Sequence, residues 1–187
     1  DLSKLICGSY GTLVALTEIT FKVLPAAAES QTLIIHNEKI ESAIFLLNSA
    51  TNSSNDISGA IFFPAEHTVF GCEMNIQQTF KLNDLKHQGS LAAIRIEGSK
   101  NSIEDRITNL KQELKITDFN ISVLQTHQSQ IFWNKIKSLE FFSSSKNSII
   151  RIVIPPSECV KLMYQFHNKF KYYADWGGAL IWLEAFE

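Results

Sequence analysis

A glycine-rich turn near the start of the sequence is the first place where residue types could do chemistry. It reads Gly8-Ser9-Tyr10-Gly11-Thr12-Leu13 and continues into Val14, Ala15 and Leu16. Glycine lets a backbone turn tightly and approach a ligand, and N–H groups exposed in such a turn can hold phosphate oxygens. The Gly-x-Gly-x-x-Gly spacing of a dinucleotide fingerprint is absent. The segment is therefore a structural turn or a phosphate site, and composition alone favours the turn.

A second motif lies near the C-terminal end, where Asp175 and Trp176 precede Gly177 and Gly178. A Gly-Gly pair between two strand-like runs predicts a hairpin, because glycine adopts positive φ at little cost. In one interpretation the hairpin only packs Trp182 into the core. In the other, Asp175 and Trp176 face a substrate site at the end of a strand. Composition alone favours the first interpretation.

One helical face could bind a soft metal ion. Cys159, Met163 and His167 are each four residues apart in a predicted helix. Cys and Met are also common core residues, and this interpretation is the stronger one. The other histidines have no ligand-spaced partner and are expected at the surface: His36, His67, His87 and His127. The sequence therefore predicts no metal site, and it identifies no catalytic residue.

Composition describes a globular chain without a strong electrostatic field. The 187 residues are 45% hydrophobic and 19% charged, with a net charge of −2. This balance argues against nucleic acid as a partner. The apolar runs are shorter than the roughly 20 residues of a membrane span. Three widely spaced cysteines form no disulfide framework, which favours a reducing, cytoplasmic compartment.

The elements that must position these motifs follow from hydrophobic periodicity. Residues 31–123 predict the order strand, helix, strand, strand, helix, strand, which is the ferredoxin-like arrangement. A further strand is possible at Thr68–Met74. The remaining elements are a helix over 129–139, a strand over 149–154, a helix after Ser157, and strands over 171–176 and 179–183. We expect an α+β fold in which an antiparallel sheet carries its helices on one face.

The first 25 residues differ in pattern from the rest. Ile19, Phe21 and Val23 alternate with polar residues, which predicts a half-buried strand that Pro25 ends. Residues 26–30 then resemble a linker. We therefore expect a domain boundary here, with residues 31–187 forming one domain and residues 1–25 the end of another that begins upstream.

Both motifs resemble one family. The stretch from Asp1 through the glycine turn to Leu16-Thr17-Glu18-Ile19-Thr20-Phe21-Lys22-Val23-Leu24-Pro25 is similar to the end of the FAD-binding (PCMH-type) domain of vanillyl-alcohol-oxidase-type flavoproteins. The stretch Asp175-Trp176-Gly177-Gly178-Ala179-Leu180-Ile181-Trp182-Leu183 resembles the C-terminal end of the accessory FAD-binding subunits of bacterial glycolate oxidases. Phe132-Trp133 and Arg151-Ile152-Val153-Ile154-Pro155 sit where these subunits have comparable residues.

The resemblance implies a function. Residues 31–187 would be the C-terminal cap, or substrate, domain of an FAD-linked oxidase that converts glycolate, a small 2-hydroxy acid, to glyoxylate. The family's flavin contacts fall on Gly8, Ser9, Tyr10, Gly11, Thr12, Leu13, Val14, Ala15 and Leu16. Asp175 and Trp176 would lie on the substrate side. Partners would be a larger FAD subunit and an iron–sulfur subunit, in the cytoplasm or at the inner membrane through that complex.

A competing hypothesis is a ferredoxin-like interaction or scaffold subunit without a flavin of its own. One glycine turn alone cannot wrap FAD. A coding sequence with a phosphate-binding loop immediately upstream would favour the enzyme, and a native start near Asp1 would favour the scaffold.

Overall fold

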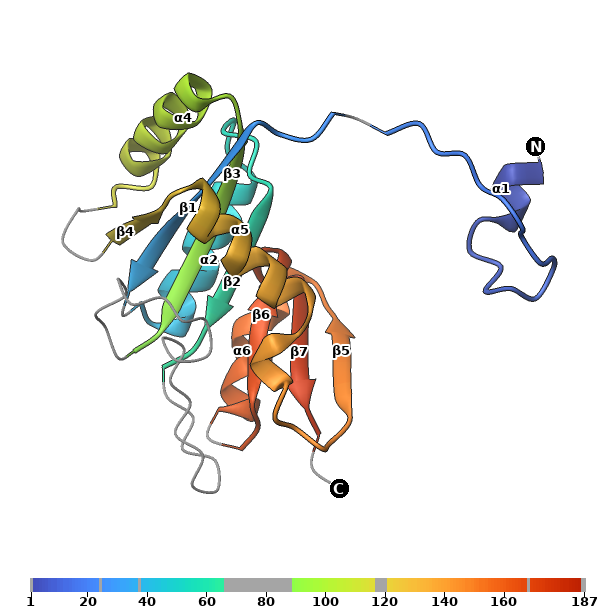
Figure 1. The fold of residues 1–187 in the computed structure, drawn as a ribbon. Coiled ribbons are helices and arrows are strands. Elements are labelled where there is room, and N and C mark those ends of the chain that lie inside the picture. The colour runs from blue at the N-terminus through green and yellow to red at the C-terminus, as the bar shows by residue number, and fades with distance from the viewer. Residues whose placement is uncertain are drawn as a thin grey trace.

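The computed structural model describes residues 2–23, 25–36, 38–65, 89–116, 121–167 and 169–185. Within them, antiparallel strands form one seven-stranded sheet in the order β4-β1-β3-β2-β6-β7-β5 (Figure 1). The strands are β1 (Glu29–His36), β2 (Gly59–Phe63), β3 (Leu91–Gly98), β4 (Ile121–Leu124), β5 (Ile149–Val153), β6 (Tyr172–Asp175) and β7 (Leu180–Glu184). The helices are α1 (Leu2–Ile6), α2 (Ile40–Thr51), α4 (Lys100–Glu113), α5 (Thr126–Lys137) and α6 (Pro156–Phe166), with 3-10 turns η2 (Glu140–Phe142) and η3 (Trp176–Gly178). The predicted α+β, ferredoxin-like class is confirmed.

The first part of the sheet has the strand order that the sequence predicts. β1 lies between β4 and β3, and β3 joins β1 to β2. α2 connects β1 to β2, and α4 connects β3 to β4. Leu33, Ile34 and Ile35 follow one another in β1, and all three are buried. A continuous apolar run fits a strand that is covered on both faces.

Helices cover both faces of the sheet, whereas the sequence predicts them on one face only. The core on one face joins α2, α4 and α6 to the strands and includes Ile44, Ile94, Ile103, Cys159 and Met163. α5 and η2 pack on the opposite face through Phe132, Trp133, Ile136, Phe141 and Phe142. An amphipathic pattern shows which side of a helix is apolar. The pattern does not show which face of the sheet the apolar side of the helix packs against. The prediction that all helices lie on one face is wrong for that reason.

The second part of the sheet is a β5-α6-β6-β7 unit that extends it beyond β2. β6 joins β2 through the pair Phe62–Ala174, and β7 lies between β6 and β5. α6 begins at Pro156, one residue before the predicted cap Ser157, because proline is well suited to the first helical turn. Among the described residues, the sheet ends at β5, which pairs with β7 alone.

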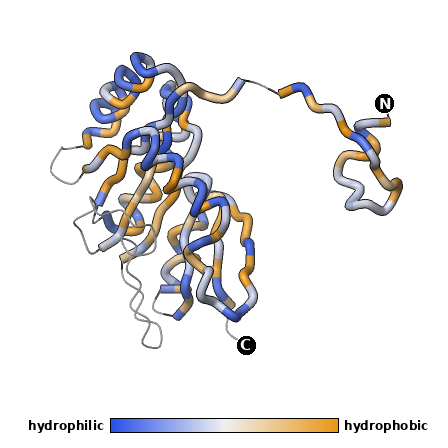
Figure 2. The backbone as a smooth tube through the Cα atoms, viewed as in Figure 1, coloured by the Kyte–Doolittle hydropathy of each residue, from blue (hydrophilic) through white to orange (hydrophobic). Residues whose placement is uncertain are grey.

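The N-terminal segment, residues 2–23, extends away from the sheet (Figure 1) and carries apolar stretches of its own (Figure 2). Ile19, Phe21 and Val23, predicted as a strand, form none and are 54%, 75% and 79% exposed. A strand needs a neighbour for its backbone hydrogen bonds, and the described residues place none beside this segment. β1 begins at Glu29, so the last two residues of the predicted linker 26–30 belong to the sheet.

Two further sequence predictions concern an additional strand and a membrane-spanning segment. The strand predicted at Thr68–Met74 lies outside the described residues. Among the helices that the structure describes, none combines the length and the apolar composition needed to cross a membrane.

Candidate functional site

The glycine turn of residues 8–16 is a local structure with an open backbone. The N–H of Thr12 donates to the carbonyl oxygen of Ser9 at 3.0 Å, and the Thr12 hydroxyl donates to the same oxygen at 2.6 Å. The two central residues, Tyr10 and Gly11, have φ of 52° and 75°. Positive φ at both central positions is the pattern of a type I′ turn, which glycine makes accessible. The tight turn predicted from the glycines is therefore present.

This turn offers space for a ligand on its glycine side. A Cβ atom added to Gly8 or Gly11 would meet no other atom within 4 Å. Tyr10 is 98% exposed, and Leu13, Val14 and Leu16 are exposed as well. Exposed backbone and apolar side chains could therefore form one wall of a cofactor site. The remaining walls would have to come from outside the described residues, so the turn fits FAD only as a partial site.

The second candidate pair, Asp175 and Trp176, lies at the end of β6. The carboxylate Oδ1 of Asp175 accepts a hydrogen bond from the backbone N–H of Trp176 at 2.7 Å. The predicted hairpin between β6 and β7 is confirmed, but Asp175 pairs with Leu180, so its loop has four residues rather than two. Gly177 and Gly178 have φ of 63° and 97°, as the hairpin requires. Trp176 shares this left-handed conformation, with φ of 52°.

The loop that carries Trp176 packs closely against helices α2 and α6. A Cβ atom on Gly178 would lie 3.3 Å from Sγ of Cys159, and one on Gly177 would lie 3.3 Å from Oγ1 of Thr51. The loop backbone thus approaches α2 and α6 so closely that only glycine fits without displacement. The indole of Trp176 points away from this packing, because 56% of the residue is exposed. The loop can therefore present Trp176 to a ligand from a well-packed base.

Arg151 is a neighbour of Trp176 that the structure adds to the site. Its guanidinium carbon lies 5.0 Å from the centroid of the indole ring of Trp176. Arg151 comes from the edge strand β5 and is exposed. Arg151 pairs with Trp182, and Trp182 pairs with Tyr173, so all three share the face of the sheet that α5 covers elsewhere. Asp175, two residues after Tyr173, belongs to the same face.

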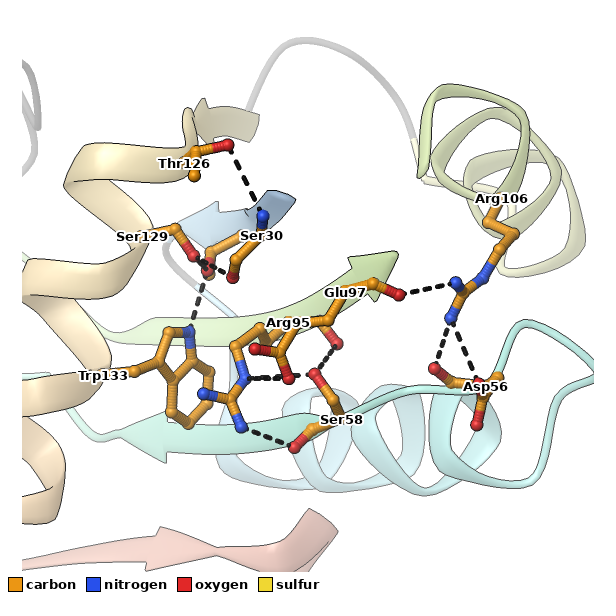
Figure 3. Close-up of polar contacts among 10 residues, drawn as sticks. Ser30, Asp56, Ser58, Arg95, Glu97, Arg106, Thr126, Ser129 and Trp133 are labelled. Atoms are coloured by element: carbon orange, nitrogen blue, oxygen red, sulfur yellow. Dashed lines mark hydrogen bonds and ion pairs between the residues drawn. The ribbon is translucent and has the colours of Figure 1, made fainter. Parts of the chain in front are cut away.

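Arg95 provides a second positive charge on this face (Figure 3). Its guanidinium lies 4.7 Å from the centroid of the Trp133 ring and donates from Nε to Oγ of Ser58 at 3.0 Å. It also forms an ion pair with Glu97 at 3.3 Å. These contacts leave Arg95 fixed beside Trp133. Its positive charge also acts to lower the pKa of the Asp175 carboxyl.

The carboxyl group of Asp175 is partly desolvated. Burial raises its pKa above the ordinary value, against the lowering effects of the Trp176 N–H and of the Arg95 charge. A carboxyl in this situation binds a proton more readily than a solvated one. It could therefore exchange a proton with a hydroxyl group placed beside it, which is a property of general acid–base groups.

The helical face considered as a metal site is part of the core. Cys159 and Met163 are buried, and the Cys159 thiol contacts Sδ of Met163 at 3.6 Å. Burial raises the pKa of Cys159 to about 12, so the thiol stays protonated at neutral pH. The described residues contain no group of three or more His, Cys, Asp or Glu side chains placed to hold a metal ion. The core interpretation explains this face.

Two other residues depart from expectation. His36, expected at the surface, is 3% exposed, and its Nε2 lies 3.1 Å from Oγ of Ser122. Arg151 has no place among the predicted site residues. The sequence feature that could have identified Arg151 is its position as the one charged residue among the β-branched residues of β5. The structure brings Arg151 to Trp176. The N-terminal segment that carries the glycine turn lies well away from strands β5 and β6 (Figure 1).

No protein-family model matches the chain. A search of curated proteins also found no significant match.

Proposed function

We propose that the chain is the C-terminal portion of a flavin-dependent 2-hydroxy-acid oxidoreductase, resembling the FAD-binding accessory subunit of a glycolate oxidase. The observation that carries the proposal is the pair of motifs at Gly8–Leu16 and Asp175–Leu183, in the family's order, at the two ends of one chain. The α+β sheet between them is compatible with a cap domain.

The two ends of the chain would contribute to different parts of the active site. The open backbone of Gly8 and Gly11 would contribute one wall of the flavin site. Bound FAD would supply the redox chemistry that converts glycolate to glyoxylate. The sheet would cover the flavin, with Asp175 and Trp176 on the substrate side. The exposed apolar residues from Leu13 to Val23 would be buried against the upstream FAD-binding domain.

The family resemblance also supplies the partners and the location of this proposal. The assembly would contain a larger FAD subunit and an iron–sulfur subunit. It would be cytoplasmic, or peripheral at the inner membrane through those subunits.

Flavin retention tests the proposal. The coding sequence extended upstream of Asp1 would be co-expressed with its neighbouring genes and purified. We expect stoichiometric FAD in this assembly. We expect little or none with the 187-residue chain alone, because one glycine turn must offset several kcal/mol of lost ligand freedom. A colourless extended assembly would contradict the proposal.

The scaffold hypothesis is the second candidate. A scaffold would start near Asp1 in the cell and would bind its partner subunits without flavin. N-terminal sequencing of the native protein separates the two, because the proposed enzyme requires a flavin-binding half before Asp1.

A further inference from the structure

The pair formed by Arg151 and Trp176 has the features of a built binding group. Arg151 is the charged residue in β5, and its guanidinium carbon lies over the indole ring of Trp176, 5.0 Å from the ring centroid. Among the described residues, Arg151 forms no ion pair with a carboxylate, whereas Arg95 and Arg106 each have one. A guanidinium stacked through its face keeps its N–H groups available at its edge. Arg151 is therefore a cation held beside Trp176, and the described residues give it no anionic partner.

The loop that carries Trp176, the residue beside Arg151, has a constrained backbone. Trp176 is a non-glycine residue with φ of 52°, a conformation that costs free energy and persists where surrounding structure imposes it. The Asp175 carboxylate accepts the Trp176 N–H at 2.7 Å, and Gly178 sits against Cys159 of α6. These contacts constrain the backbone of the loop that carries the indole. Strain that is maintained beside an exposed aromatic ring and a stacked arginine is typical of ligand sites.

The chemistry of the Arg151 guanidinium matches one class of ligand. A guanidinium fork binds a carboxylate through two parallel hydrogen bonds. A small molecule with a carboxylate group would therefore satisfy Arg151.

We propose that Arg151, supported by Trp176, binds the carboxylate of a small organic acid. That this acid is the substrate of the enzyme rests on the proposed function. The binding site itself depends only on residues that the chain contains, so it is testable without flavin.

Ligand titration of the 187-residue chain tests the site. The probes are sodium glycolate and glycolamide, which keeps the hydroxyl but replaces the carboxylate with a neutral amide, at ionic strength held constant with chloride. The readout is the NMR shift of the Trp176 amide and indole N–H signals. We expect a saturable shift with glycolate and none with glycolamide.

Two variants assign the effect to the arginine. Arg151→Gln should weaken glycolate binding by at least about tenfold, because the charge-assisted bidentate contact is lost. Lys161→Gln removes the same charge from an exposed position on α6 and should bind glycolate as the wild type does. Equal affinity in Arg151→Gln and wild type would overturn the proposal, as would equal shifts with glycolamide or the absence of a saturable shift. Urea unfolding of both variants checks that the fold is intact.

The assembled enzyme separates this inference from the proposed function. In the flavin-containing assembly, Arg151→Gln should raise KM for glycolate about tenfold or more at unchanged flavin content. If Arg151→Gln leaves KM for glycolate unchanged in the flavin-containing assembly, the proposed binding site is wrong but the proposed function is still supported. If the assembly contains no flavin but the chain shows the Arg151-dependent glycolate shift, the function is wrong and the site stands.

Discussion

The indole ring of Trp133 lies directly against the backbone of Gly59. A Cβ atom built on Gly59 would come within 2.7 Å of Cη2 of Trp133, closer than real atoms approach. Trp133 belongs to α5 and Gly59 begins β2, so this contact sets how closely the helix lies on its face of the sheet. The absence of a side chain at position 59 is therefore a packing requirement of the fold.

Gly59→Ala should destabilise the chain by roughly 1–3 kcal/mol, the usual cost of overpacking a well-filled core. The added methyl group must push Trp133 and α5 away from β2. Urea unfolding measures the loss. In a double-mutant cycle, Gly59→Ala should cost less in a Trp133→Phe background, because the smaller ring leaves room for the methyl group. Purely additive costs would show that the two residues do not meet.

A buried hydroxyl network forms the second link between α5 and the sheet (Figure 3). The Thr32 hydroxyl accepts from Nε1 of Trp133 at 2.8 Å and lies 2.7 Å from the hydroxyl of Ser129. Thr32→Val should cost about 1–3 kcal/mol, because it leaves two buried polar groups without this partner. Thr108→Val is the matched control, since Thr108 is exposed on α4 and bonds only to the Glu104 carbonyl of its own helix. Equal unfolding midpoints for the two variants would contradict the network.

Hydrophobic periodicity was sufficient to predict most of the sheet. The β1-α2-β2-β3-α4-β4 order follows from it, because each of these elements buries a face that repeats with its own period. The face that α5 covers was not predictable. Phe132 and Ile136 mark an apolar side of the helix, but the choice of sheet face depends on long-range contacts such as that of Trp133 with Gly59.

The candidate site was only partly predictable from the sequence. Asp175 and Trp176 were identified by their place beside the two glycines of a hairpin. Arg151 is 25 residues away in sequence and meets Trp176 because β5 and β6 flank β7. The alternation of Ile19, Phe21 and Val23 predicted a strand that the structure does not form, because a strand also requires a neighbour and the described residues provide none.

Gly177→Val should destabilise the chain more than Ser144→Val. Gly177 has φ of 63°, where a β-branched residue is strained by roughly 1–2 kcal/mol. Its new side chain would also meet Oγ1 of Thr51. Ser144 is exposed in a loop, whereas the neighbouring Ser145 is unsuitable as a control because its hydroxyl donates to Glu184 at 2.6 Å. Thermal unfolding compares the two, and a smaller loss for Gly177→Val would show that the loop tolerates side chains.

Gly11→Asp should remove flavin from the extended assembly without unfolding the sheet domain. A carboxylate about 4 Å from a flavin phosphate costs on the order of 4 kcal/mol before screening, at an effective dielectric near 20. Gly11→Asn is the matched control, because asparagine has nearly the same shape and similar tolerance of positive φ but no charge. Flavin content and unfolding midpoint are measured on both. Flavin retained by Gly11→Asp would show that the turn does not face the cofactor, and loss of the fold in both variants would make the turn structural.

Anaerobic reduction of the purified assembly tests the central claim most directly. The chain, extended upstream and co-purified with its neighbouring subunits, would be titrated with glycolate while the visible absorption bands of oxidised flavin are recorded. A flavin-dependent 2-hydroxy-acid oxidoreductase predicts that these bands bleach in proportion to the glycolate added, with glyoxylate as product. Bands that remain unchanged at saturating glycolate and D-lactate, or an assembly without flavin, would contradict the account.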